Sequence, residues 1–99
     1  MSSRIILKLL FTALQGSLPY EYDEKYVNDM GRGDTIIISK TGSDRSMHIT
    51  ANKPYGSSVL DLALYDDTCD DDPLEISQWD ADDPSFVFLD LITYIEKSF

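Results

Sequence analysis

The chain has 99 residues, of which 42% are hydrophobic, and its 18 acidic and eight basic residues give a formal net charge of −10. This length predicts a single domain over residues 1–99, and the apolar fraction excludes a wholly disordered chain. The negative charge excludes direct binding of DNA, RNA or an anionic membrane by general electrostatic attraction, because all three are polyanions.

The charge is unevenly distributed along the chain. Residues 1–60 carry seven basic and six acidic residues, whereas residues 61–99 carry twelve acidic residues and one basic residue. Between Asp61 and Asp83 there are ten acidic residues and no basic residue. The last two fifths of the chain therefore hold the whole negative charge, and we expect the contact with a partner there.

The cysteine content and the start of the chain bear on the compartment. The single cysteine, Cys69, excludes an intramolecular disulfide and with it a disulfide-built secreted scaffold. Residues 4–14 begin with a base and continue with apolar residues, as a secretion signal does, but Lys8 interrupts the run. The run is also too short to span a bilayer. We therefore expect a cytoplasmic protein without membrane contact.

The first thirty residues predict one helix or two. Serines at the start can cap an apolar helix over residues 5–14, with Gly16 as its C-terminal stop. Tyr22, Tyr26 and Met30 follow at a spacing of four, which favours a short second helix. A loop that contains the tyrosines is the alternative.

Three β-rich segments follow, at residues 34–40, 46–51 and 58–65. The connections between them are too short for crossovers, so they predict an antiparallel meander. In the third strand one face holds three leucines, which should pack on the helices, and the other holds Val59, Asp61, Ala63 and Tyr65. Residues 74–77 can add a short fourth strand.

A last helix is predicted from Pro84, with Asp83 as its N-cap. Its expected buried face consists of Phe88, Leu91, Ile92, Ile95 and Phe99. The predicted fold class is α+β: an N-terminal helix or two, a three-stranded antiparallel β-meander, an acidic connection over residues 66–83, and a C-terminal helix packed on one sheet face.

Metal binding and catalysis find little support in the sequence. A calcium loop that starts at Asp66 would need Gly at its sixth position and Glu at its twelfth, where the chain has Asp71 and Ser77. One cysteine and one histidine, His48, cannot build a structural zinc site. The aspartates stand in a turn-rich, hydrated segment and lack the dry pocket of a general acid. We therefore expect no metal, no cofactor and no enzyme activity.

The acidic region is the predicted contact surface. Leu74, Ile76 and Trp79 interrupt it, so we expect it to be held against the body of the protein rather than to extend as a tail. A rigid array of carboxylates presents negative charges at fixed separations, as the phosphates of duplex DNA do. The candidate partner-binding residues are Asp61, Asp66, Asp67, Asp70, Asp71, Asp72, Glu75, Asp80, Asp82 and Asp83.

A second candidate surface consists of Tyr20, Glu21, Asp23 and Glu24, because tyrosine is enriched at protein interfaces. The alternative places Tyr22 and Tyr26 in the core, while Tyr20 and the acids face water.

In size, acidity and order of elements, the chain resembles the small phage-encoded inhibitors that imitate DNA. Anti-CRISPR proteins are the nearest group; anti-restriction proteins and uracil-DNA glycosylase inhibitors are others. The ten acids named above carry the resemblance. It implies a protein that acts in the host cytoplasm and blocks the DNA-binding or PAM-reading site of a defence nuclease, whose arginines the carboxylates occupy. We expect a monomer or small homo-oligomer.

Two other functions stay open at this point. An immunity protein or antitoxin that neutralises a basic toxin would use similar chemistry on one specific partner. An adaptor that binds through its tyrosine-rich surface would keep its partner at high salt.

Overall fold

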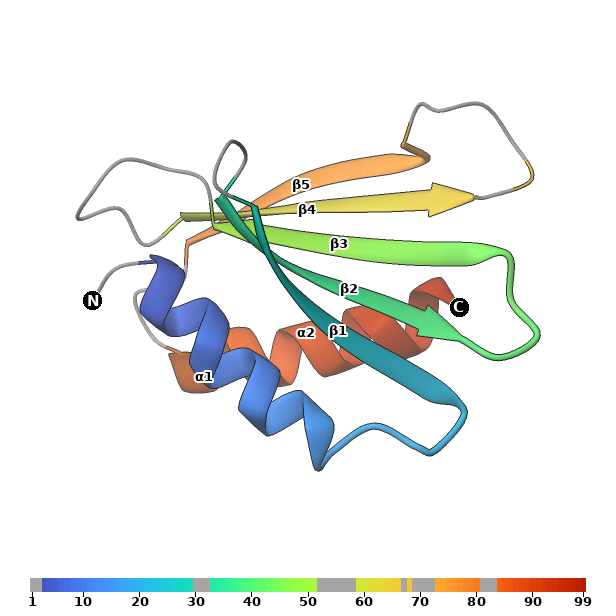
Figure 1. Ribbon diagram of the computed structural model, residues 1–99, viewed down its shortest axis with the longest axis horizontal. Coiled ribbons are helices and arrows are strands. Elements are labelled where there is room, and N and C mark those ends of the chain that lie inside the picture. Colours follow the sequence, from blue (N-terminus) through green and yellow to red (C-terminus); the bar gives the residue numbers. More distant parts are fainter. Residues whose placement is uncertain (1–2, 30–32, 52–58, 67, 69–72, 81–83) are drawn as a thin grey trace.

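The computed structural model describes residues 3–29, 33–51, 59–66, 68, 73–80 and 84–99. Along the chain, five strands follow the first helix and precede the second. They form one antiparallel sheet in the order β1-β2-β3-β4-β5, so each strand pairs with its neighbours in sequence. Both helices lie on the same side of this sheet (Figure 1). The elements are α1 (Ser3–Gln15), β1 (Tyr22–Asp29), β2 (Gly33–Lys40), β3 (Arg45–Ala51), β4 (Val59–Asp66), β5 (Glu75–Asp80) and α2 (Pro84–Ser98).

Helix α1 supplies the centre of the core. Its fully buried side chains recur at helical spacing and are Ile6, Leu7, Leu10 and Leu14. The polar positions Lys8, Thr12 and Gln15 are exposed. The helix ends at Gly16, whose backbone N–H donates to the carbonyl of Ala13 at 3.3 Å.

Helix α2 begins at Pro84, where the sequence places its first residue. Its predicted apolar face does face the core: Leu91 and Ile95 are fully buried, and Phe88, Ile92 and Phe99 pack against the core while partly buried. The ring of Tyr94 on this helix meets Trp79 of β5 edge-on, with centroids 5.7 Å apart. This contact fixes α2 beneath the β5 side of the sheet.

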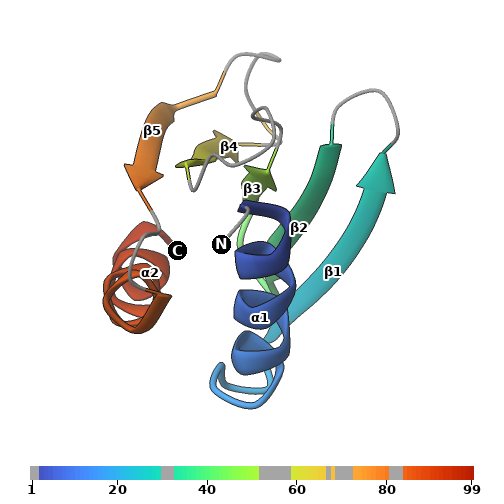
Figure 2. The same cartoon turned by 90° about the vertical axis from the view of Figure 1, so that its left-hand side faces the viewer.

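The two faces of the sheet differ in burial. On the inner face, the alternating residues of the three central strands are almost fully buried: Ile36, Ile38, Met47, Ile49, Leu60, Leu62 and Leu64. The leucine face of β4 therefore packs on the helices as predicted. Figure 2 shows the sheet arching over both helices. We call the opposite side, to which the intervening residues of each strand point, the open face.

Two expectations about the strands require correction. The sheet has five strands rather than three, and residues 22–29 form β1 rather than a second helix or a loop. A spacing of four between Tyr22 and Tyr26 satisfies a strand as well as a helix, because it is a multiple of two. Pairing decides between them: β1 aligns with β2, with Tyr26 opposite Ile36, and both tyrosines pack against the core.

The fifth strand, β5, is longer than the short strand that residues 74–77 predict. Its pairing with β4 continues to Asp80 because Trp79 lies opposite the buried Leu60 and adds apolar surface to the core. Of the predicted acidic connection over residues 66–83, the segments 67, 69–72 and 81–83 lie outside the described residues.

Candidate protein-binding surface

Strands β4 and β5 carry the predicted partner-binding acids that the structure describes. These are Asp61, Asp66, Glu75 and Asp80, and each is exposed or half-buried. The other six, Asp67, Asp70, Asp71, Asp72, Asp82 and Asp83, lie outside the described residues.

Asp61 and Asp80 form one pair on the open face. Asp61 lies opposite Gln78, and Asp80 is two residues further along β5. The Cα atoms of diagonal neighbours of this kind are about 7–8 Å apart. The Nε2 of Gln78 donates a hydrogen bond of 3.0 Å to Oδ1 of Asp61, which orients that carboxylate.

Asp66 and Glu75 form a second diagonal pair, at the other end of the two strands and on the inner side of the sheet. Glu75 lies opposite Leu64, two residues before Asp66. Asp80 lies opposite Val59, at the far end of β4, so the centres of the two pairs are five residues apart along the strands, or roughly 17 Å. The four described carboxylates therefore form two pairs at opposite ends and on opposite sides of the β4–β5 hairpin, and not one patch.

The environment of the second pair differs between its members. The backbone N–H and the hydroxyl of Thr68 donate hydrogen bonds of 2.9 and 2.6 Å to Oδ1 of Asp66. These bonds lower the pKa of Asp66, and the charge of Arg45 lowers it further, so Asp66 stays ionised. Burial raises the pKa of Tyr94, and its hydrogen bond with Glu75 raises it further. Glu75 is thereby tied to α2.

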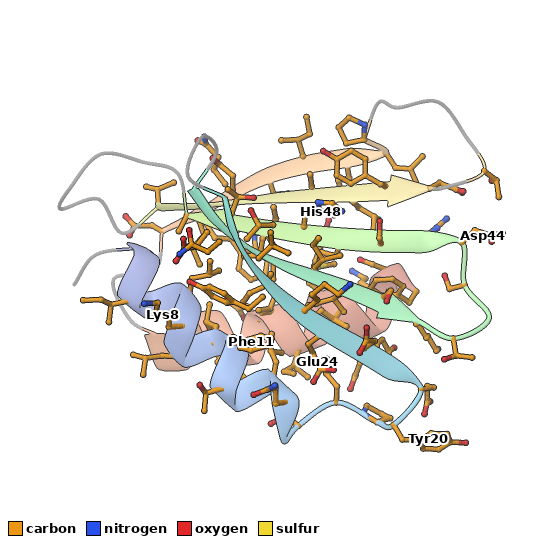
Figure 3. All side chains as sticks on the ribbon, in the orientation of Figure 1. Lys8, Phe11, Tyr20, Glu24, Asp44 and His48 are labelled. Carbon is orange, nitrogen blue, oxygen red and sulfur yellow. The ribbon has the colours of Figure 1, made fainter. Side chains whose placement is uncertain are left out.

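The second predicted surface is divided by the geometry of β1. Tyr20 is 99% exposed in the connection between α1 and β1 and projects away from the body of the protein (Figure 3). Glu21 is half-buried. Asp23 points to the open face and Glu24 to the inner face, because they are successive residues of one strand. Burial raises the pKa of Glu24, and the neighbouring charge of Asp23 raises it further.

Sequence reasoning missed an apolar row across the open face. The register places Lys25, Ile37, His48, Ala63 and Ile76 side by side across all five strands. Ile76 is 70% exposed, and Ile37, His48 and Ala63 are half-buried. The ring of His48 also contacts that of Tyr65, with centroids 4.7 Å apart. Alternation within β4 predicts that Ala63 and Tyr65 share one face of the strand. Only the register between strands shows that Ile37 and Ile76 lie on the same face beside Ala63.

Metal-binding geometry does not occur in the described part of the chain. There, no three or more His, Cys, Asp or Glu side chains come together as a group that could hold a metal ion. Neither of the two described helices is long and apolar enough to cross a membrane.

Comparison with known proteins adds no family. No protein-family model matches the chain, and no curated protein or solved structure matches it either. The fold and surface define an α+β protein with an acidic β4–β5 hairpin and an apolar row on the open face of its sheet. A functional assignment therefore depends on the chemistry of these surfaces.

Proposed function

We propose that the protein is an acidic inhibitor that imitates nucleic acid and occupies the DNA-binding or PAM-reading site of a host defence nuclease complex. The observation that carries this proposal is the charge of residues 61–99, which hold twelve acidic residues against one basic residue. Among the described residues of this region, all six acids are exposed or half-buried: Asp61, Asp66, Glu75, Asp80, Asp90 and Glu96.

The sheet supports the proposal because it holds carboxylates at fixed separations. Asp61, Asp66, Glu75 and Asp80 all belong to β4 or β5, which pair along their whole described overlap. Backbone pairing removes most of the conformational entropy that a flexible acidic tail would lose on binding. A cationic groove that recognises phosphates can take such carboxylates instead, and arginine can do so with two parallel hydrogen bonds.

The physical consequence is binding that depends strongly on salt. A dense field of one sign steers an oppositely charged partner and raises the association rate at low ionic strength. The low pKa of Asp66 keeps that carboxylate charged in mildly acidic conditions as well.

The test is competition with DNA on purified guide-RNA-loaded nucleases. A fluorescent duplex that carries the correct PAM is bound to each nuclease, and the protein is added at low and at physiological salt. We expect the protein to displace the duplex, with an affinity that falls as salt rises. The proposal is contradicted if the protein displaces DNA from none of the tested nucleases at low salt, or if the displacement does not depend on salt.

A second experiment distinguishes the proposed inhibitor from an antitoxin by asking whether the protein competes with DNA or instead neutralises a basic toxin. An antitoxin neutralises its toxin without competing with DNA, whereas the proposed inhibitor competes directly for the DNA-binding surface. We therefore expect the displacement curves to fit a single-site model, in which the nuclease binds either DNA or the protein but not both.

A further inference from the structure

One row of the open face has an unusual composition for a surface turned to solvent. An antiparallel sheet with helices on one side normally presents polar residues on the other. Here the central row contains Ile37, Ala63 and Ile76, whereas the next row holds Val27 beside the polar residues Thr35, Thr50, Asp61 and Gln78. Ile76 stands 70% exposed on the edge strand β5. Within the described ranges of the chain, no helix or strand packs on this face.

The dimensions of this face fit a small protein interface. Five strands at about 4.8 Å spacing give a width of about 19 Å, and strands of eight residues give a length of about 26 Å. The projected area is then roughly 500 Å², which lies at the small end of what one partner contributes to a specific contact. Binding through such a face gains from long-range electrostatic attraction.

The charges on the face select the occupant. Asp23, Asp61 and Asp80 point to this side, and Lys25 is the one lysine or arginine among its described residues. A second copy of the chain would bring two acidic faces and two net charges of −10 together, which electrostatic repulsion opposes. Nucleic acid is opposed by the same charges. A basic protein surface is complementary to them.

We propose that the open face docks a basic protein surface. The partner's apolar side chains pack on the row Ile37, Ala63 and Ile76, and its arginines pair with Asp61 and Asp80. The ring of His48 lies within the row, between Ile37 and Ala63, and contacts the ring of Tyr65. Tyr65 can stack with an arginine there. That this surface belongs to a nucleic-acid-binding protein rests on the proposed function, whereas its basic charge and the place of contact rest on the residues of the open face.

The test uses two synthetic peptides of equal charge. One consists of four Arg-Arg-Leu repeats and the other of four Arg-Arg-Ser repeats, and each is titrated into isotope-labelled protein. We expect the leucine peptide to bind about tenfold more tightly. Its amide shift changes should centre on Ile37, Ala63 and Ile76. Changes centred on α1 or α2, or equal affinities for both peptides, overturn the proposal.

A matched pair of variants removes one exposed apolar side chain from each side of the molecule without altering charge. Leu89 on α2 is 63% exposed, close to the value for Ile76. We expect Ile76→Ser to lose most of the preference for the leucine peptide and Leu89→Ser to keep it. Equal effects of the two variants contradict docking on the open face.

Sedimentation of the free protein tests the remaining occupant. A concentration-dependent dimer that Ile76→Ser abolishes and Leu89→Ser leaves intact shows that a second copy covers the face, which overturns the proposal. A monomer throughout supports it.

Failure of DNA displacement refutes the proposed function and leaves the peptide result standing. Failure of the peptide test, with DNA displacement intact, places the inhibitory contact elsewhere.

Discussion

The hydroxyl of Tyr26 donates a hydrogen bond to Oδ2 of Asp34 and so joins β1 to β2 on the inner face of the sheet. Asp34 is only 3% exposed. A carboxylate removed from water in this way requires hydrogen bonds in compensation. Tyr26 therefore does more than fill space beside the ring of Phe11, whose centroid lies 5.4 Å from its own.

Tyr26→Phe removes this hydroxyl and keeps the ring. We expect the free energy of unfolding to fall by about 1–3 kcal/mol, because a buried acceptor loses a donor. Urea denaturation followed by circular dichroism measures the change. Tyr20→Phe is the control, since Tyr20 is 99% exposed, and an equal loss in both variants would argue against a role for the bond.

The buried face of α2 gives a prediction about packing. Ile95 is fully buried and Leu89, on the same helix, is 63% exposed. Ile95→Ala should lower the free energy of unfolding by about 2–5 kcal/mol, and Leu89→Ala should change it by less than about 0.5 kcal/mol. Chemical denaturation of both variants checks this, and similar midpoints would mean that α2 is not docked as described.

Arg45 connects β3 to the C-terminal end of α2. Its Nη1 donates a hydrogen bond of 2.9 Å to the backbone carbonyl of Ser98, where a cation also interacts favourably with the helix dipole. Arg45→Met should lower the free energy of unfolding by about 1 kcal/mol. Thermal unfolding measures the loss, and Lys8→Met on the exposed side of α1 is the charge-matched control.

Glu24 predicts a pH dependence of stability. Its pKa in the folded state lies above the ordinary value of a glutamate, chiefly because burial disfavours the charged form. The folded state therefore binds the proton more tightly, and Glu24 makes the protein less stable as the pH rises through this range. Glu24→Gln should raise Tm at pH 7 and have little effect near pH 3. A Tm difference that does not grow with pH contradicts this assignment, and Glu96→Gln, exposed on α2, controls for loss of charge.

The acids of the open face predict a positional effect on inhibition. Asp61→Asn with Asp80→Asn removes two charges from that face, and Asp90→Asn with Glu96→Gln removes two from α2. The first pair should weaken displacement of DNA by about tenfold, and the second should weaken it less, because only close charge pairs couple strongly. Equal effects would show that net charge alone governs the competition.

The helices and the central strands followed from the sequence because their signals are local. Ile6, Leu7, Leu10 and Leu14 recur at helical spacing, and Leu60, Leu62 and Leu64 alternate. Each pattern has one compatible structure that brings these side chains to one buried face. Pro84 marks the start of α2 by the same local logic.

The edge strands were harder because their apolar residues are few and their periods ambiguous. Tyr22 and Tyr26 fit a helix and a strand equally, and only the partner β2 distinguishes them. The arrangement of the surface was out of reach for a related reason. Asp66 belongs to β4, one residue beyond the strand predicted at residues 58–65, and alternation then places it on the side opposite Asp61. The row that contains Ile37 and Ile76 is defined by pairing across strands.

The order of the strands in the sheet has a consequence for the way the chain acquires its structure. Since every strand lies beside the one before it in sequence, each hairpin can close over a short loop as soon as its second strand has left the ribosome. Such local pairing favours rapid folding. The inner face, however, has its full apolar cover only after α2 has been made and Leu91 and Ile95 have docked. Until then the nascent chain exposes the apolar inner face, which is the part of the protein most prone to aggregation. The negative charges of its carboxylates repel neighbouring chains during that interval.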